Sequence, residues 1–341
     1  MILAAAVVLT VVGAALSIFL YLPALAVAES LSPRRASARA AIWFCALVIP
    51  ILAGALCAAI GLMRVTGDPY ASPHLTAGRP HLCAKWLGTL PDARWLVTLG
   101  GSMCFGLVIA GAVRTIFRAV RSCWAVRRFG PTLAGSDRVA VIASPTVFIG
   151  TVGLLRPITI TTQATQMILD EDELRAVMAH EAQHVRRRDN IAELLVGACV
   201  TCLVFVPTVH LFARYWREEV ERACDDAAAH RQSPEAVCSA MVKLAQVGER
   251  EARQRIVPPV QAVWREAAAD VQRRVARLLQ PEAGAEDNPP GDVTIIGVVL
   301  TAGALTALAL GIAATGRQVG DTIHCLSETL LSVLRYGAGS P

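Results

Sequence analysis

Apolar residues along this chain gather in long uninterrupted blocks rather than in the short periodic stripes of a soluble protein. Residues 2–28, 41–63 and 95–117 are apolar almost throughout, and each is long enough as a helix to cross a hydrocarbon core of about 30 Å. A further block lies at residues 293–315, after a linker rich in proline and glycine at 281–292. The pattern predicts a helical membrane protein with four spans. The first block has a second interpretation as a cleaved signal peptide, but it lacks a preceding basic region and is too long, so we expect a retained span.

A different pattern begins near residue 138, where short β-branched runs replace the long apolar blocks. Residues 139–142, 147–149 and 158–160 are such runs, and proline and glycine separate them. Runs of this length between turn residues are typical of strands. We therefore expect a small sheet before the next helical pattern.

An amphipathic helical pattern follows the acidic run at residues 170–173, and it contains the H-E-x-x-H string at 180–184. Residues four apart share one face of a helix, so His180 and His184 are placed to bind one Zn²⁺. Glu181 lies beside the first imidazole, where a carboxylate serves as general base toward water at the metal. The alternative is a surface helix that happens to carry two histidines.

A third ligand is expected in a second helical stretch, residues 218–226. Zinc hydrolases keep three protein ligands and leave the fourth position to water. We expect Glu221 to complete the ligand set, and Asp225, one turn later, to hold a ligand imidazole by its second nitrogen. Glu218 and Glu219 are interpreted as a solvated acidic face.

The apolar stretch at residues 191–212 separates the two metal motifs and is long enough to suggest a span. A single crossing would put His180 and Glu221 on opposite sides of the bilayer. Pro207 interrupts the helical hydrogen bonds, and Glu193 would be a costly charge in hydrocarbon. We predict a hairpin of two helices, broken near Pro207, in or against the cytoplasmic leaflet.

Composition supports a membrane protein, and the arginines give it an orientation. The chain is 54% apolar and 17% charged, with a net charge of +5. Arginines follow the first and third spans: Arg34, Arg35, Arg39, Arg114, Arg118, Arg121, Arg127, Arg128 and Arg138. Arg273, Arg274 and Arg277 precede the fourth span in the same way. By the positive-inside rule these regions are cytoplasmic, so both termini are expected outside. The juxtamembrane position explains the arginines better than nucleic-acid binding, so no direct nucleic-acid contact is expected.

Ten cysteines occur without the regular spacing of a secreted disulfide framework, and most lie in apolar segments. On the predicted topology Cys83 and Cys325 both face outside. A disulfide between them is therefore an additional hypothesis.

Two strings carry a resemblance to a known family. Residues 177–190 read VMAHEAQHVRRRDN, and residues 218–228 read EEVERACDDAA. They resemble the H-E-L-x-H-x-x-R-x-D and E-x-x-C-D-D motifs of BlaR/MecR-type integral membrane zinc metallopeptidases, with Arg187 and Asp189 matching the first motif. The strings GLLRPITI and QRRVARLL are similar to further family landmarks, so the resemblance covers roughly residues 130–280.

The resemblance implies a zinc endopeptidase that cleaves a cytoplasmic protein after a signal from outside. The substrate would be a BlaI/MecI-like transcriptional repressor, the protease itself, or both. Arg187 and Asp189 are expected to brace the end of the metal-binding helix. An edge strand would pair with extended substrate, and we expect residues 158–161 to be that edge. The tail at 316–341 is too short for the penicillin-binding sensor of the drug-sensing relatives, so direct β-lactam sensing is not expected.

Two other functions stay open at this stage. One is a general quality-control or maturation protease of membrane proteins, and the other is a non-proteolytic signal transducer with a structural zinc site. Glu181 disfavours the second, because a structural site needs ligands and no base. A donor that stabilises the transition state is not identified; His210 and His230 are candidates that fit structural roles better. Association of two copies of the chain as a homodimer is also possible at this stage.

The expected fold class is mainly α, a multi-span helical membrane protein with a cytoplasmic zincin-like α+β metalloprotease domain. The expected segments are three transmembrane helices with their loops at 1–125, the protease domain at 126–280 with its membrane-associated hairpin at 191–212, the linker at 281–292, the fourth span at 293–315 and an extracellular tail at 316–341.

Overall fold

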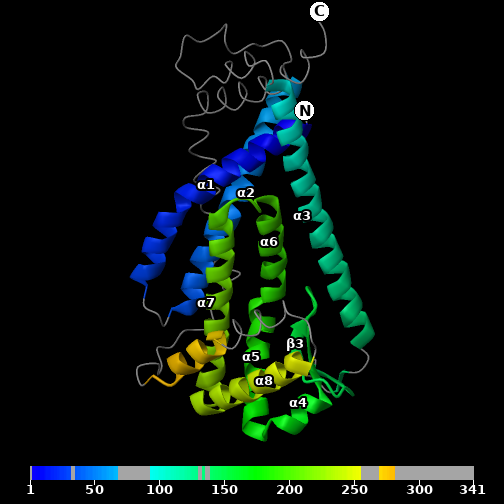
Figure 1. Cartoon of the computed structure of the whole chain (residues 1–341), viewed down its shortest axis with the longest axis vertical. Coiled ribbons are helices and arrows are strands. Elements are labelled where there is room, and N and C mark those ends of the chain that lie inside the picture. The colour runs from blue at the N-terminus through cyan, green and yellow to red at the C-terminus, as the bar shows by residue number, and fades with distance from the viewer. Residues whose placement is uncertain are drawn as a thin grey trace, which may run out of the picture.

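A bundle of long helices stands on a smaller layer of strands and short helices (Figure 1). The computed structural model describes residues 2–31, 35–67, 93–129, 133–134, 139–254 and 269–280. Most of these residues are helical, and the few strands lie in the region where β-branched runs predicted them. The expected fold class, mainly α with a small α+β domain, is confirmed.

Three long helices form the upper part of the molecule: α1 (Ile2–Ser30), α2 (Ala36–Gly67) and α3 (Ala93–Phe129). Each contains a stretch long and apolar enough to cross a membrane: Ala5–Ser30, Ala36–Ala59 and Thr98–Arg128. At 37 residues α3 is about 55 Å long, which exceeds the thickness of a hydrocarbon core. Its far end therefore extends beyond a bilayer and reaches the sheet, where Gly153 N–H donates to Ser122 Oγ (Figure 1).

The stretch between the two metal motifs forms a helical hairpin. The first arm, α6 (Asp189–Cys202), ends before a short break, and the second arm, α7 (Pro207–Arg231), starts at the proline. Proline fits the first turn of a helix because that position needs no N–H donor. The hairpin rises between α1, α2 and α3, and Ser17 Oγ of α1 lies 2.7 Å from Thr208 Oγ1 (Figure 1). The reversal returns the chain to the end of the molecule where it entered. Insertion of this hairpin into a bilayer stays a prediction.

The four strands form one sheet in the order β1-β2-β4-β3. Their bounds are Leu133–Ala134 for β1, Val139–Ile142 for β2, Ile149–Val152 for β3 and Ile158–Thr162 for β4. β4 pairs in parallel with β2 and antiparallel with β3, so it lies inside the sheet. The prediction that residues 158–161 form the edge strand is wrong, and β3 is the edge that lies beside the helix of the H-E-x-x-H string.

The threonines of β4 lie inside the sheet and not at its edge. All five residues of β4 are buried. Thr162 illustrates why burial is tolerated: its Oγ1 donates to the carbonyl of Thr146 at 2.9 Å and accepts from Phe148 N–H at 3.2 Å. Buried hydroxyls with such partners carry little penalty. The same side chain accepts from Thr165 N–H and begins α4 (Gln163–Ile168).

Helix α5 (Glu171–Arg187) is fixed at its start by the acidic run. Asp170 and Glu173 form a reciprocal capping box, which satisfies two N–H groups of the first turn. Glu173 is also bound by Lys243 and Ser239 of α8 (Pro234–Gln254), at 2.7 and 2.5 Å. Burial by itself raises the pKa of Glu173, but these hydrogen bonds outweigh it and lower the pKa below its ordinary value. The ionised carboxylate thus ties α5 to α8.

Several sequence predictions lie outside the described residues. They are the linker at 281–292, the fourth span at 293–315, the tail at 316–341, and the pairing of Cys83 with Cys325. These stay predictions.

Candidate metal centre

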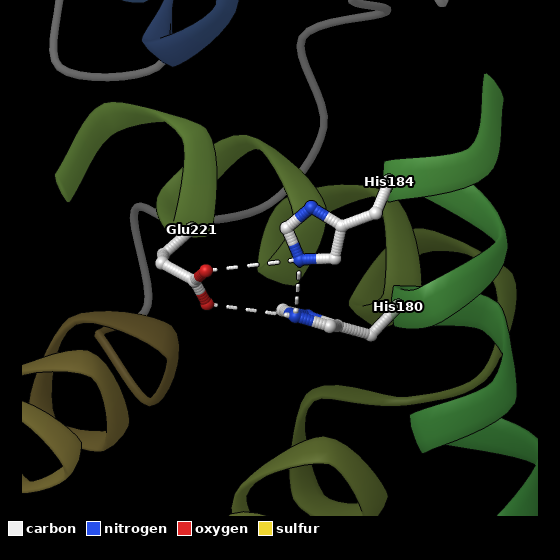
Figure 2. Close-up of side chains that lie close together, drawn as sticks. All are labelled: His180, His184 and Glu221. Atoms are coloured by element: carbon white, nitrogen blue, oxygen red, sulfur yellow. Dashed lines mark hydrogen bonds and ion pairs between the residues drawn. The ribbon is translucent and has the colours of Figure 1, made fainter. Parts of the chain in front are cut away.

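Helices α5 and α7 bring three potential ligands together (Figure 2). His180 and His184 lie one turn apart on α5, with their Nε2 atoms 3.2 Å apart. Glu221 approaches from α7, and its two carboxylate oxygens lie 3.6 Å from His180 Nε2 and 3.7 Å from His184 Nε2. The hairpin of α6 and α7 makes this meeting possible, since it returns Glu221 to the end of the molecule that holds α5.

The donor set and its spacing fit a zinc ion. Ligand atoms about 2.0–2.1 Å from zinc at tetrahedral angles lie about 3.3 Å from one another. Two imidazole nitrogens and one carboxylate are a donor set of catalytic zinc sites, in which a fourth position remains for water. The three side chains are partly exposed, at 13%, 16% and 37% for His180, His184 and Glu221. Water and substrate therefore have access to the side where the ligands converge.

His180 is held from behind by an aspartate and an arginine. Its Nδ1 donates to Asp225 Oδ1 at 3.1 Å, and Asp225 is completely buried. Arg274, from the helical residues 269–278, binds both oxygens of Asp225 at 2.8 and 2.6 Å. A further amino group of Arg274 lies 3.1 Å from Glu221 Oε2. Arg274 therefore fixes both the carboxylate behind one imidazole and the carboxylate beside it.

His184 is held by a second aspartate and arginine. Its Nδ1 donates to Asp189 Oδ2 at 2.8 Å, and Arg187 Nε lies 3.3 Å from both oxygens of Asp189. Cys224 Sγ lies 3.5 Å from the same Nδ1. We expected Asp189 only to brace the helix end; the structure places it on the imidazole itself. With Nδ1 donating in this way, the Nε2 of each imidazole is left to face the metal.

His184, Asp189 and Cys224 also lie close enough to be considered as a separate metal site. Burial, and the negative charge of Asp189 after it, raise the pKa of Cys224 well above its ordinary value, so the thiol stays protonated. Asp189 is already engaged with Arg187 and with the imidazole. These groups are better described as the support of His184 than as a second centre.

Negative charge dominates the centre. Burial lowers the pKa of His180, but the hydrogen bonds with Asp225 and Glu221 outweigh it and raise the pKa to about 10. Burial raises the pKa of Glu221, yet His180, Arg274 and His184 together bring it down to about 2. Burial likewise opposes ionisation of Asp225, and His180 and Arg274 lower its pKa. The carboxylates are therefore ionised, and they favour a cation at the imidazole nitrogens.

Glu181 lies beside the ligands and is oriented by the edge strand. Thr151 Oγ1 of β3 donates to Glu181 Oε2 at 2.8 Å. The contact leaves Oε1 for another partner and holds the carboxylate against the strand next to the centre. This is the place where the sequence predicts a general base.

Among the residues that contact the predicted site residues, several were not identified from the sequence, including Thr151, Cys224 and Arg274. Cys224 and Arg274 lie in strings that carried the family resemblance, but nothing local indicated their partners. The arginines of residues 272–279 were assigned to the membrane boundary, whereas Arg274 and Arg277 bind Asp225 and Asp226. Those ion pairs join segments about 50 residues apart, so only the folded chain reveals them.

Other candidates lie away from the centre. His210 is eleven residues before Glu221 on α7, about 16 Å along the helix, and its Nε2 lies 2.7 Å from the carbonyl oxygen of Val204. His230 is exposed near the end of α7. Glu219, expected to be solvated, is buried and bound by Arg39 and Arg222. The expectation of a wholly solvated acidic face is wrong for Glu219, because a membrane helix covers it.

The fold and the site together describe a protein with several helices of membrane length and a candidate metal centre. Residues 134–278 match the family described as BlaR1 peptidase M56, which supports a membrane metallopeptidase of the BlaR/MecR type in this part of the chain. The match falls within the region over which the motifs indicated the resemblance, and that prediction is confirmed. No curated protein and no solved structure matches the chain.

Proposed function

We propose that this protein is a zinc-dependent endopeptidase of the membrane, in which His180, His184 and Glu221 bind the metal and Glu181 is the general base. The observation that carries the proposal is the convergence of three ligand atoms within 3.2–3.7 Å of one another, next to the Thr151-bound carboxylate of Glu181. The family match supports a metallopeptidase at this position.

When bound, the zinc ion would supply Lewis-acid chemistry, lowering the pKa of water and polarising the scissile carbonyl. Glu181 accepts the proton of the attacking water and later delivers it to the leaving amine. Asp225 and Asp189 keep the two imidazoles in the tautomer that exposes Nε2. Arg274 holds Glu221 in position and balances part of its charge.

The edge strand β3 gives the substrate a place to bind. An extended peptide laid along a sheet edge gains main-chain hydrogen bonds and is held across the metal. The end of β3 is already occupied, because Asn190 Nδ2 donates to the carbonyls of Thr151 and Gly153 at 3.3 and 2.8 Å. Hydrogen-bonded pairs alternate along an antiparallel ladder, and Thr162 N–H donates to the Phe148 carbonyl, so Gly150 faces β4 and Ile149 faces the open edge. We therefore expect substrate to pair with the main chain of Ile149, two residues before Thr151.

The substrate is proposed to be a cytoplasmic protein, either a transcriptional repressor or the protease itself. The end of α3 that reaches the sheet carries Arg118, Arg121, Arg127 and Arg128, and the end of α2 beside the site carries Arg39. Arginines at this end support a cytoplasmic position for the metal centre under the positive-inside rule. A bilayer-embedded hairpin at 191–212 fits the same orientation.

The experiment compares wild type with Glu181→Ala, each purified in detergent or nanodiscs, for zinc content and for cleavage of the candidate repressor and of itself. We expect equal zinc in both proteins and a loss of cleavage by about 10²–10⁴-fold in the variant. Glu171→Ala, on the exposed first turn of the same helix, is the matched control and should cleave as wild type does.

Other outcomes would redirect the proposal. Equal zinc with no cleavage of either substrate by wild type would favour the non-proteolytic transducer. Cleavage of unrelated damaged membrane proteins, with the repressor left intact, would favour a quality-control protease. Zinc that remains after His180→Ala would contradict the ligand assignment.

A further inference from the structure

One turn at the start of α2 contacts both helices that carry the candidate ligands. Ser37 Oγ accepts a hydrogen bond from Arg187 Nη1 at 3.0 Å, at the end of α5. Arg39 Nε donates to Glu219 Oε1 of α7, also at 3.0 Å. Because α5 carries both histidines and α7 carries Glu221, this turn joins the two sides of the ligand set.

The first contact continues to a ligand through two ionic side chains. Arg187 is 1% exposed; it donates to Ser37 Oγ on one side and to Asp189 on the other. Asp189 in turn accepts from His184 Nδ1. Arg188 between them has φ 57° and ψ 38°, in the left-handed region that non-glycine residues rarely adopt. Such a conformation persists where the surroundings determine it. Here the contacts of Arg187 and Asp189 on either side hold Arg188 in this conformation, and the hydrogen bond from Arg187 to Ser37 is one of these contacts.

The second contact acts on the helix of the third ligand. Glu219 is 3% exposed and lies two residues before Glu221, so its ion pair with Arg39 fixes the turn of α7 that presents Glu221. One turn further along α2, Trp43 packs against Tyr215 with ring centroids 4.8 Å apart. The start of α2 and this part of α7 therefore lie against each other over more than one turn.

Helix α2 also belongs to the membrane part of the molecule. Its apolar stretch, Ala36–Ala59, is one of the candidate spans and packs along α1 (Figure 1). Ser37 and Arg39 lie in the first turn of that stretch, at the boundary between the bundle and the metal centre. A catalytic metal site tolerates displacements of only about 0.5 Å in its ligands. A shift of α2 therefore has a direct route to the site.

We propose that Ser37 and Arg39 are positioning residues of the metal centre: Ser37 acts on His184 through Arg187 and Asp189, and Arg39 acts on Glu221 through Glu219. A displacement of α1 and α2 in the bilayer then changes the geometry of the ligand set. This inference rests on the proposed function, since it assigns a control of the same centre.

The test uses the full chain in lipid nanodiscs with Co²⁺ in place of zinc, because its visible absorption reports the arrangement of the donor atoms and needs no substrate. We expect Ser37→Ala and Arg39→Gln each to change the absorption and to weaken Co²⁺ binding about tenfold. Ser37→Thr, which restores the hydroxyl, should recover the wild-type spectrum. Combining Ser37→Ala with Asp189→Asn should weaken binding less than the two losses added together, because both changes act on one contact chain.

Two matched controls separate positioning from general packing. Ser17→Ala removes another hydroxyl contact between a membrane helix and α7, away from the centre, and Arg175→Gln removes an exposed arginine of α5. Both should keep the wild-type spectrum. If Ser37→Ala does not fold, the comparison of Arg39→Gln with Arg39→Lys decides, since only lysine keeps the charge.

The outcomes distinguish this inference from the proposed function. A wild-type spectrum in both Ser37→Ala and Arg39→Gln, or equal losses in Ser17→Ala, would overturn the positioning role. Co²⁺ binding that depends on His180 without any proteolysis would overturn the proposed function, while the spectra would still decide the positioning role. Failure of wild type to bind Co²⁺ would overturn both.

Discussion

His180 and His184 are supported by the same three-part arrangement of imidazole, aspartate and arginine, but the two arginines come from different parts of the molecule. Behind His180, Asp225 is fully buried and bound at both oxygens by Arg274. Behind His184, Asp189 keeps 12% of its side chain exposed and makes two longer contacts, of 3.3 Å, with Arg187.

This difference indicates which aspartate–arginine pair is held rigidly and which is connected to the membrane helices. Arg274 comes from residues 269–278, which pack against α7 and α8 in the lower layer (orange in Figure 1), and its paired short bonds define one geometry. Arg187 is close in sequence to its aspartate and reaches on to Ser37 of α2. The His180 side therefore acts as the fixed reference of the centre, and the His184 side is the one connected to the membrane helices.

The largest expected effect comes from breaking the fixed side. Asp225→Asn removes the buried carboxylate that Arg274 binds through two short hydrogen bonds and leaves Glu221 as its remaining partner, at a cost of about 3–5 kcal/mol. We expect zinc affinity to fall at least 100-fold and the melting temperature to drop by several degrees, measured by metal analysis after dialysis and by thermal unfolding. Asp172→Asn, an exposed acid on α5, is the control. Retained zinc and melting temperature in Asp225→Asn would contradict the rigid-support interpretation.

Substitution of Arg274 tests the same pair, Asp225 and Arg274, from the arginine. Arg274→Gln should reduce zinc affinity by about 10–100-fold, because Asp225 and Glu221 both lose their cation. Arg274→Lys keeps the charge without the paired bonds and should lie between the variant and wild type. The neighbouring Arg273→Gln, whose side chain is 60% exposed, should match wild type in a zinc titration. Equal losses at both arginines would show a general effect of basic charge instead.

Asp189 tests the side connected to the membrane. Asp189→Asn keeps an oxygen for His184 Nδ1 but removes the negative charge from Arg187 and the imidazole. We expect a loss of zinc affinity of about tenfold, smaller than at Asp225 because this support is more exposed and less tightly bonded. Asp270→Asn, in the exposed pair with Arg273, serves as control. A larger loss at Asp189 than at Asp225 would reverse the comparison.

The smallest effect is expected at Glu173, at the start of α5, the helix that carries both histidines. The pKa of Glu173 is lower in the folded protein than its ordinary value of 4.5, so its ionised form stabilises the fold above that pH and the contribution is lost as the pH falls through the folded pKa. Glu173→Gln should therefore cost about 2 kcal/mol near neutral pH. The difference in melting temperature from wild type should shrink as the pH is lowered toward 4 and below. A difference that is constant with pH would mean that packing, and not charge, sets the contribution.

Local patterns in the sequence were sufficient for much of the fold. The apolar blocks predicted helices of membrane length, and α1, α2 and α3 each contain one. The acidic run at 170–173 predicted the start of α5, and the capping box of Asp170 and Glu173 begins the helix there. A single crossing by residues 191–212 would separate His180 from Glu221, so a reversal near Pro207 was predicted, and α7 starts at that residue. Each of these features depends on residues within a few positions of one another.

The edge strand and the arginines could not be assigned in this way. Which strand lies at the edge depends on how β4 pairs with β2 and β3, and burial of its threonines is a property of the finished sheet. Arg274 was interpreted as a membrane-boundary charge because its partner Asp225 is 49 residues away. Charge alone does not specify a partner when loop closure can bring many segments together at similar entropic cost.

The sequence by itself indicated the helices of membrane length, the pair of histidines on one helical face with Glu181 beside them, and the resemblance that the family match supports, because helix period and motif spacing are local. Only the tertiary structure decided that β3 and not β4 borders the site, that Asp189 and Arg274 serve the imidazoles, and that the first turn of α2 reaches both ligand helices. These are contacts between distant segments, and they are set by the packing of helices and strands, which no short stretch of sequence contains.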